Sequence, residues 1–398
     1  MDFVKKTLGD LTIGKGQYGI GASAVDYSED LYTYLRITDI NDDGTLNVNN
    51  LKSINDKNAE RYLLQPNDIV FARTGNSTGR NYFYDGTDGI LVYAGFLIKF
   101  SIDSSKVNPK YIKYYCMSDE YKGWVQGHLT GSTRGNINAQ TYANMEISIP
   151  PREQQNRIVS ILEELERKRK NNIAINRNLS EQAETLFKSW FEDYEPWNGE
   201  IPTDWKQGVL GDFVTIKRGG SPRPIQEYLS DEGLRWLKIS DVSGLQSPYV
   251  LEIAEHIIKA GLKKTVYLEA GSLVLSNSAT PGIPKILDVD SCIHDGWLYF
   301  PESQLSNYFL YLFYKSIRPK LVALGNGSVF TNLKTDILKG YSFSKPDNDT
   351  LYKFDEIVAP MFRMMREVAR ENQRLSELRD SLLPKLMSGE LNVSSLNI

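Results

Sequence analysis

The sequence is poor in the residues that build metal sites and disulfide frameworks. Its 398 residues include two cysteines, Cys116 and Cys292, and three histidines, His128, His256 and His294, all far apart. They fit no zinc-ligand spacing and indicate a reducing compartment. No apolar run approaches the roughly 20 residues that span a bilayer, and the first residues lack the apolar core of a signal peptide. We therefore expect a cytoplasmic protein with no metal and no membrane association.

The sequence also lacks an excess of positive charge. Its formal net charge of −4 is mild evidence against DNA binding, because a basic patch is the usual footprint of a nucleic-acid-binding surface. Binding depends on local potential, however, and net charge is a sum over the whole surface. The hydrophobic fraction of 41% is typical of a globular protein, and 398 residues exceed one ordinary domain. We expect two or more cores, and no tight DNA binder acting alone.

The chain contains an internal repeat. Six short segments of the first half recur in the second half, in the same order and at nearly constant spacing. The pairs are residues 7–10 with 209–212, 35–40 with 237–242, 64–71 with 268–275, 131–133 with 327–329, 147–150 with 343–346, and 178–181 with 374–377. This order indicates duplicated domains that diverge mainly between the matched segments.

Each half has the pattern of a mixed α/β domain followed by a long helix. β-Branched and aromatic residues between turn signals predict strands. In the first half these are residues 6–13, 32–40, 68–73, 95–100 and 145–149, with a helix over 108–127; in the second half they are 213–216, 235–242, 272–276 and 297–300, with a helix around 307–316. The fold class expected is therefore α+β.

The predicted long helices carry a seven-residue repeat, which is typical of a coiled coil. The first row is Ile158, Leu165, Asn172, Leu179 and Leu186, and in the second half Phe354, Met361, Val368, Leu375 and Leu382. A second row is assigned to Ile161, Ile175, Ile357, Met364 and Leu378, interrupted by Lys168, Gln182 and Glu371. We expect the helices to pack on each other, antiparallel and with pseudo-two-fold symmetry. The alternative is that each lies on its own domain. Asn172 either fixes the register or faces water.

Two short motifs superficially suggest an enzyme. Residues 14–19 (GKGQYG) fit a dinucleotide-binding pattern, but no helix signal follows and the second half lacks the spacing, so a basic turn near DNA or a plain surface loop is favoured. Residues 108–111 (NPKY) resemble a methyltransferase motif, but Pro109 at a first helical position favours a helix start. No carboxylate cluster or nucleophile–histidine pair emerges. We expect no catalysis by this chain.

Polar, glycine-containing turns supply the candidate DNA contacts, because base edges are read by Arg, Lys, Asn, Gln, Ser and Thr. They occur as pairs that share a position between the halves but differ in their donors; the alternative is ordinary solvated turns. The candidates are Lys15, Gln17, Arg73, Thr74, Asn76, Ser77, Arg80, Ser132, Thr133, Arg134 and Asn136 in the first half, and Arg218, Ser221, Arg223, Ser276, Asn277, Ser278, Thr280, Ser328 and Asn332 in the second.

The chain resembles the specificity subunits of type I restriction–modification systems over essentially its whole length. Three segments carry the resemblance: residues 64–73 (LQPNDIVFAR), 147–155 (ISIPPREQQ) and 381–391 (SLLPKLMSGEL). The first long helix departs from the family pattern, since it ends in KSWFEDY at residues 188–194. The resemblance implies two target-recognition domains, residues 1–150 and 196–346, and two conserved long helices, residues 151–195 and 347–398.

The same resemblance implies function and partners. Each domain would bind one half of a bipartite asymmetric site in double-stranded DNA, and the coiled coil would set the gap. Two modification subunits carrying S-adenosylmethionine would dock on it, and a restriction subunit is optional. The expected docking residues are Leu186, Phe187, Trp190, Phe191, Leu382, Leu383, Leu386 and Met387. The alternatives are the specificity subunit of a methylation-only complex, and a structural adaptor that bridges proteins without reading DNA. The target bases and the gap length do not follow from the sequence.

Overall fold

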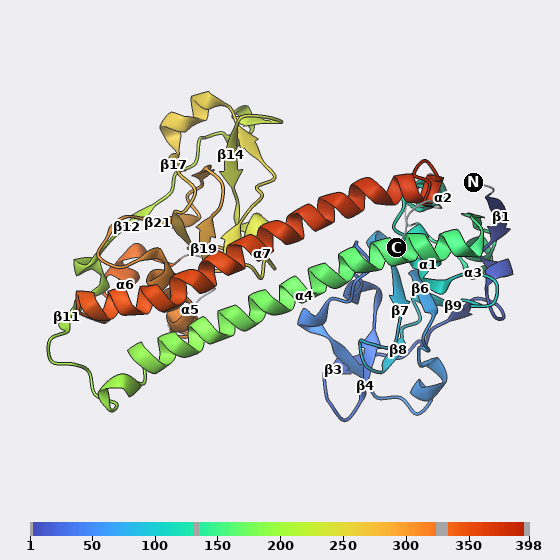
Figure 1. Cartoon of the computed structure of the whole chain (residues 1–398), viewed down its shortest axis with the longest axis horizontal. Helices are drawn as coiled ribbons and strands as arrows, with labels where there is room; N and C mark the ends of the chain where they lie inside the picture. The colour runs from blue at the N-terminus through green and yellow to red at the C-terminus, as the bar shows by residue number, and fades with distance from the viewer. Residues whose placement is uncertain (1–2, 130–134, 324–332, 394–398) are drawn as a thin grey trace. The chain divides into compact units, whose positions relative to one another are not determined.

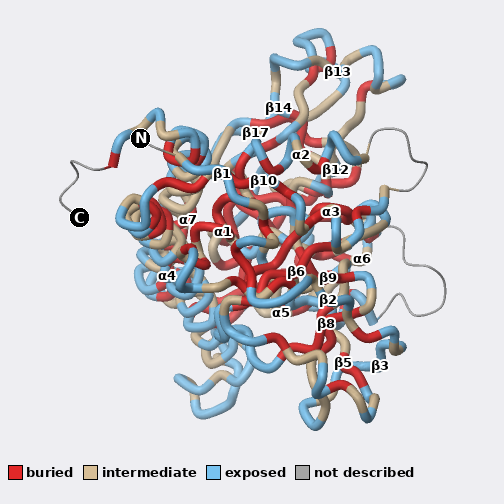
Figure 2. The backbone as a smooth tube through the Cα atoms, turned by 90° about the vertical axis from the view of Figure 1, so that its right-hand side faces the viewer, coloured by how far each residue is buried: buried red, intermediate tan, exposed pale blue. Residues whose placement is uncertain are grey.

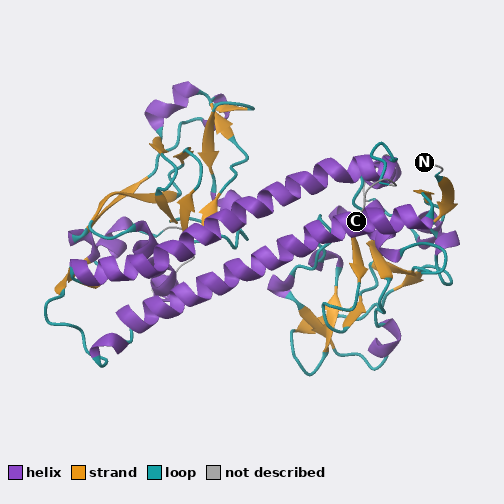
Figure 3. Ribbon diagram, in the orientation of Figure 1, coloured by secondary structure: helices purple, strands orange, loops and turns teal. Residues whose placement is uncertain are grey.

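The structure is a computed structural model that describes residues 3–129, 135–323 and 333–393. The chain forms two compact units that differ from the division expected from the sequence. Unit 1 is residues 1–167 together with 376–398, and unit 2 is residues 168–375. The boundary falls inside both long helices, α4 (Arg152–Phe191) and α7 (Asn348–Ser388). Each unit therefore contains one sheet-bearing domain and a segment of each long helix (Figure 3).

Unit 1 contains two four-stranded sheets and one two-stranded ribbon (Figure 1). The ribbon pairs β1 (Val4–Thr7) with β10 (Glu146–Ile149). The first sheet has the order β2 (Gln17–Tyr18), β9 (Leu97–Ser101), β6 (Asp68–Ala72), β7 (Asn81–Tyr84), and the second has β3 (Ala24–Asp26), β5 (Lys52–Ile54), β4 (Tyr32–Leu35), β8 (Leu91–Tyr93). The short helices are α1 (Pro109–Tyr115), α2 (Asp119–Leu129) and α3 (Ala139–Ala143).

Unit 2 repeats this topology with one additional strand in each sheet. Its ribbon pairs β11 (Lys206–Val209) with β22 (Ser342–Lys345). Its sheets have the orders β12 (Val214–Arg218), β21 (Trp297–Ser303), β18 (Leu273–Ser276), β19 (Pro284–Leu287), β15 (Tyr249–Val250), and β13 (Leu229–Ser230), β16 (His256–Ile257), β14 (Leu234–Leu237), β20 (Ser291–Ile293), β17 (Val266–Leu268). The helices are α5 (Asn307–Ala323) and α6 (Thr335–Lys339). In both units the equivalent pair, β4 with β8 and β14 with β20, is parallel. The internal repeat is thus visible in strand order and direction.

Most predicted strands exist but are shorter than expected. The segments predicted at 6–13, 32–40 and 235–242 end as strands at Thr7, Leu35 and Leu237, and each continues into a short 3-10 helix. The single helix predicted over 108–127 is two helices, α1 and α2, separated at residues 116–118. Asn108 caps α1 by accepting a hydrogen bond from Lys110 N at 3.0 Å, which confirms the predicted helix start.

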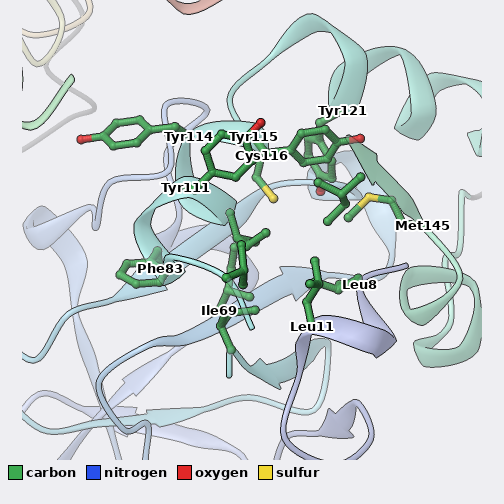
Figure 4. Close-up of a cluster of buried hydrophobic side chains, with 14 of the residues drawn as sticks. Leu8, Leu11, Ile69, Phe83, Tyr111, Tyr114, Tyr115, Cys116, Tyr121 and Met145 are labelled. Carbon is green, nitrogen blue, oxygen red and sulfur yellow. The ribbon is translucent and has the colours of Figure 1, made fainter. Parts of the chain in front are cut away.

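The core of unit 1 forms where α1 covers the first sheet. β6 is buried along its whole length and appears red in Figure 2. The side chains of Tyr111 and Tyr115 from α1 lie in the same cluster as Ile69 and Phe83 from the sheet (Figure 4). Burying each large side chain of this kind contributes about 1.5–3 kcal/mol. This cluster fixes the sheet whose loops carry the candidate site.

The long helices contact each other within each unit. In unit 1, Ile158 and Leu162 of α4 share a core with Leu383 and Leu386 of α7. In unit 2, the opposite ends of the same helices meet in an aromatic cluster. It contains Phe187 and Phe191 of α4, Phe354 of α7 and Phe309 of α5. The alternative in which each helix lies only on its own domain is therefore wrong.

Four of the five apolar residues predicted for the second row of the seven-residue repeat are exposed, whereas Ile161 is partly buried against the core of unit 1. Ile175, Ile357, Met364 and Leu378 are 42%, 42%, 53% and 46% exposed. The buried second row lies four residues after each first-row position instead of three, and includes Leu162, Ala183, Val358, Met365 and Leu386. Polar residues interrupt this row at Arg169, Asn176, Asn372 and Arg379, which hides it in the sequence.

Asn172 fixes the packing of the two helices in unit 2. Its side chain is buried, and its Nδ2 donates to Glu371 Oε2 on α7 at 2.8 Å. Lys168 Nζ lies 3.3 Å from the same carboxylate. The amide is therefore satisfied across the seam and does not face water.

Among the described residues, no helix is long and apolar enough to cross a membrane.

Candidate nucleic-acid interface

Each unit carries a polar loop after its central strand, and the two loops have the same backbone frame. Loop 1 is residues 73–78, between β6 and β7, and loop 2 is residues 277–281, between β18 and β19. The hydrogen bonds that frame loop 1 are Arg73 N to Phe96 O at 3.0 Å, Gly79 N to Ala72 O at 2.9 Å, and Ile137 N to Arg73 O at 2.9 Å. Those that frame loop 2 are Asn277 N to Gly296 O at 2.8 Å, Gly282 N to Ser276 O at 2.8 Å, and Leu333 N to Asn277 O at 2.6 Å. Arg73 and Asn277 therefore occupy equivalent positions.

In unit 1 the loop brings three of the predicted segments together. The Arg73 guanidinium lies over the ring of Tyr18, 5.1 Å from its centroid, directly after Gln17 on β2. Thr74 forms a backbone bridge with Asn136. Among the described residues, the buried Nε of Arg73 has no hydrogen-bond partner. A buried N–H without a partner is costly, so this donor is available to a ligand.

Two other predicted residues of unit 1 have internal partners. Arg80 Nε lies 2.6 Å from Asp42 Oδ1, and its NH1 donates to Ile40 O at 3.2 Å. Ser77 is 9% exposed. Arg80 therefore braces the domain behind loop 1, while Asn76 and Lys15 remain exposed.

In unit 2 the predicted residues converge on Asp295, in the turn before β21. Arg218 Nε donates to Asp295 O at 2.5 Å, Ser221 Oγ donates to Oδ1 at 2.8 Å, and Arg223 NH2 lies 3.1 Å from Oδ2. Burial acts to raise the pKa of Asp295, but the hydrogen bond from Ser221 and the charges of Arg218 and Arg223 outweigh it and lower that pKa. The carboxylate is therefore ionised at neutral pH and orients Arg223, while the backbone carbonyl of the same residue holds Arg218.

Ser276 and Asn277 shape loop 2. Both are buried, at 0% and 2% exposure. Ser276 Oγ donates to Thr280 O at 2.6 Å and accepts from Ile283 N at 2.8 Å. Ser276 therefore closes its own loop, and direct contact of Ser276 or Asn277 with DNA stays a prediction. Ser278 is half-buried and Thr280 is exposed.

Asn277 nevertheless keeps one unsatisfied atom. Its Nδ2 contacts Asp295 O at 3.4 Å, but within the described chain its buried Oδ1 has no partner. Arg73 shows the same feature at the equivalent position of unit 1, with a donor in place of an acceptor. Of the other predicted contacts, Asn136 is exposed, whereas Ser132, Thr133, Arg134, Ser328 and Asn332 lie outside the described residues.

Sequence reasoning missed three residues of these sites. Tyr18 supports Arg73, Asp295 organises the arginines of unit 2, and Phe96, beside loop 1, is 57% exposed. Tyr18 stands in the glycine-containing segment 14–19, Phe96 belongs to a predicted strand, and Asp295 stands in an Asp-Gly turn. Only a comparison of the two halves of the sequence could have pointed to these residues. Phe96 and Asp295 each lie at a position where the other half has glycine.

The glycines of the dinucleotide-like motif have a packing role. A Cβ added to Gly19 would lie 2.3 Å from Ala94 O, and one added to Gly219 would lie 2.3 Å from His294 O. Only glycine fits such a close approach of two backbone segments. Gly19 is followed by β3 and not by a helix, which confirms that the nucleotide-fold interpretation was correctly set aside. Across the described residues, no group of His, Cys, Asp or Glu has the geometry of a metal site.

The residues predicted to dock partner subunits are largely internal. Phe187, Leu383, Leu386 and Met387 are buried in the cores of their units. Leu186, Trp190, Phe191 and Leu382 are partly buried against the same cores. All eight side chains thus contribute to the cores of their own units, and their docking of partner subunits stays a prediction.

Comparison with known proteins gives one family. The model for the type I restriction modification DNA specificity domain matches residues 1–184 and again residues 202–379. The two matches correspond to the two halves of the repeat.

Similar proteins share this description. The chain is 24% identical over 316 residues to the type I restriction enzyme MjaIX specificity subunit of Methanocaldococcus jannaschii, covering 74% of this chain and 72% of that protein. It is 22% identical over 459 aligned residues to the HindI specificity subunit of Haemophilus influenzae, covering 94% and 99%. The crystal structure of the type I restriction-modification S subunit from M. genitalium has the same fold, with a TM-score of 0.59, 16% identity, and coverage of 97% and 96%.

Proposed function

The chain belongs to the family of type I restriction modification DNA specificity domains, and on that premise we propose that it is the non-catalytic specificity subunit of a type I complex. Each unit would bind one half of a bipartite, asymmetric site in double-stranded DNA. Two modification subunits would bind this chain and supply S-adenosylmethionine and the methyl-transfer chemistry. A restriction subunit would join the same assembly.

One observation carries the proposal. Loops 1 and 2 share a backbone frame, yet the equivalent Arg73 and Asn277 hold an unsatisfied buried donor and an unsatisfied buried acceptor within the described chain. Direct readout requires donors and acceptors matched to base edges. A shared frame with opposite polar groups is what two readers of different base sequences need. An adaptor that bridges proteins gives no reason for this difference.

We further propose that α4 and α7 form an antiparallel coiled coil that fixes the distance between the half-sites. In support, the beginning of α4 and the end of α7 share one core in unit 1, and the other two ends share a core in unit 2. The hydrogen bond from Asn172 to Glu371 gives the seam a defined register.

The spacing role has its own test. Repeating residues 179–185 inserts seven residues and keeps the repeat in phase. At 1.5 Å per residue the helix lengthens by about 10 Å, which corresponds to at most about three base pairs at 3.4 Å each. A longer gap between unchanged half-sites supports the proposal, and an active variant with an unchanged gap contradicts it.

The function as a whole is tested by methylome sequencing of cells that express this chain with its modification subunits. The expected result is a split, asymmetric methylated motif that disappears when this chain is omitted. A continuous motif, or methylation that does not depend on this chain, contradicts the proposal. Cleavage of unmodified DNA by the purified assembly separates a restricting complex from a methylation-only one.

A further inference from the structure

Unit 2 contains a cavity beside loop 2 that has no assigned role. Its volume is about 810 Å³. Pro224 and Ile239 give it apolar walls, and Ser240, Ser278 and His294 give it polar ones. The adjacent Arg223 reaches the cavity from the Asp295 cluster, so the cavity opens among the predicted DNA contacts.

His294 presents a single hydrogen-bond donor at this cavity. Its Nδ1 accepts a hydrogen bond from Gly296 N at 2.7 Å, so the neutral ring carries its proton on Nε2. The ring lies 6.0 Å from Trp236 and 6.4 Å from Trp297 between centroids, which limits its rotation. Burial lowers the pKa of His294, which keeps the ring neutral at pH 7. The side chain is still 18% exposed, so Nε2–H is a fixed donor within reach of a ligand.

The lining of the cavity favours one class of base edge. None of the described lining residues carries a carboxylate or a carboxamide. These are the groups that recognise the amino groups of adenine and cytosine in the major groove. His294 Nε2–H matches a keto oxygen instead, and apolar Ile239 and Pro224 match a thymine methyl group. The other cation of the wall, Lys238, is paired with Glu255.

We propose that this cavity reads the major-groove edge of one keto base in the half-site bound by unit 2, with His294 donating to the keto oxygen. The inference rests on the proposed function and makes His294 a specificity-determining residue. Unit 1 has no such donor, because Ala94 stands at the equivalent position: Leu97 N bonds Ala94 O at 2.8 Å, as Trp297 N bonds His294 O at 3.1 Å. The cavity therefore distinguishes the two readers.

The test uses the assembled complex of this chain with its modification subunits and the motif found by methylome sequencing. The shorter side chain of His294→Asn keeps an oxygen that accepts from Gly296 N–H but has no donor at the position of Nε2. His294→Gln carries an amide donor close to that position. His256→Asn, in the same unit but outside the cavity lining, is the matched control. Because either His294 variant could disturb packing, Ser240→Ala at the exposed rim serves as a milder second change.

We expect His294→Asn to relax one base pair of the unit 2 half-site, with a loss of roughly 5- to 150-fold in discrimination there. His294→Gln should recover part of it, and His256→Asn should change nothing. At that pair, 4-thiothymine tests for a thymine and 6-thioguanine for a guanine, because sulfur replaces the keto oxygen in each. The analogue that weakens the wild type should not weaken His294→Asn further.

Three results overturn the inference: an unchanged motif in folded His294→Asn and Ser240→Ala, relaxation in the half-site of unit 1, or equal effects of either analogue on wild type and variant. A wild-type complex without any split motif would instead contradict the proposed function. Failure of the inference about His294 is therefore distinguishable from failure of the proposed function.

Discussion

In each unit an arginine lies at the candidate site, but the two arginines come from different elements of the common backbone frame. In unit 1 the arginine is Arg73 on loop 1, and Tyr18 on β2 supports it. In unit 2 the position of Tyr18 is taken by Arg218, since Gly19 N and Gly219 N make equivalent bonds to Leu97 O and Trp297 O. The loop position then holds Asn277. The two units thus share a backbone frame but carry different side chains at its equivalent positions. The backbone, and not the side chains, therefore defines the common site.

The units also differ in the charges that hold the sheet-bearing domain to a long helix. In unit 1, Lys113 of α1 lies 2.5 Å from Glu166 of α4. In unit 2, Lys315 of α5 pairs in the same sense with Glu184 of α4. Unit 2 adds a pair of the opposite sense, in which Asp288, after β19, lies 2.8 Å from Arg370 of α7 and also pairs with Arg366.

The largest expected effect concerns the helix junctions, which are aromatic in unit 2 and aliphatic in unit 1. Phe354→Ala should lower the free energy of unfolding by about 3–5 kcal/mol, and Leu386→Ala by about 2–5 kcal/mol, because both side chains are fully buried. Ile357→Ala, three residues from Phe354 and exposed, should cost within about 0.5 kcal/mol. Chemical denaturation measures all three. If Ile357→Ala lowered the free energy of unfolding as much as Phe354→Ala, Ile357 would be a buried position of the second row, as the sequence predicts.

A smaller effect depends on pH and should occur in unit 2 alone. Burial, helped by the charge of Lys315, lowers the pKa of Lys285 to about 7, while the ordinary value is about 10.4. Between these values the unfolded chain binds more protons, so stability rises with pH by at most about 1.4 kcal/mol per unit. Tyr82 pairs with Val70 as Lys285 pairs with Val274, and burial raises the pKa of Tyr82, so it stays protonated.

The measurement compares the wild type with Lys285→Met by chemical denaturation at pH 7, 8 and 9. The free energy of unfolding of the wild type should rise more steeply over this interval, by about 2–3 kcal/mol in total. Tyr82→Phe should leave the wild-type slope unchanged. Parallel slopes for wild type and Lys285→Met would mean that the ammonium is not buried as the structure has it.

The third effect tests Asp295, for which unit 1 has Gly95. Asp295→Asn removes the charge that orients Arg223 and keeps the shape of the residue. Specific affinity of the complex should fall about tenfold, the scale of one charge-assisted hydrogen bond, while non-specific binding at low salt should not fall. Asp290→Asn, which removes an equal charge elsewhere in unit 2, should leave the ratio of specific to non-specific affinity unchanged. If both variants lower that ratio equally, Asp295 does not organise the site.

The smallest effect is at Phe96, where unit 2 has Gly296. Because Phe96 is 57% exposed, Phe96→Ala should change stability by less than about 0.5 kcal/mol. If the ring contacts DNA beside loop 1, affinity for the half-site of unit 1 should fall by up to about fivefold, and the other half-site should be unaffected. Fluorescence anisotropy with duplexes altered in one half-site measures both. A loss at the half-site of unit 2 would assign Phe96 to the wrong reader.

Much of the fold followed from the sequence because duplication left a visible pattern. The repeat, the main strands and the first row of the long helices were all predicted, since they rest on apolar periodicity. The second row was missed because Arg169, Asn176 and Asn372 occupy inward positions. Two-residue strands such as β2 and β13 leave no pattern of their own.

The candidate site was predicted only as a set of loops. Composition marked the polar turns, but it did not separate Arg73, which has an unsatisfied donor, from Arg80, which is bound to Asp42. Nor did it show that Ser276 closes its own loop. Such roles depend on contacts between segments far apart in the sequence, and those contacts appear only in the folded chain.

The central account, one frame with two separate readers, is tested most directly by methylome sequencing of Arg73→Ala and Arg218→Ala side by side, with Arg61→Ala as a control on the surface of unit 1. We expect each of the first two variants to relax a different half of the motif, at a cost of about 1–3 kcal/mol in base discrimination, and the control to keep the wild-type motif. Relaxation of the same half, or of both halves, by either variant would contradict the account.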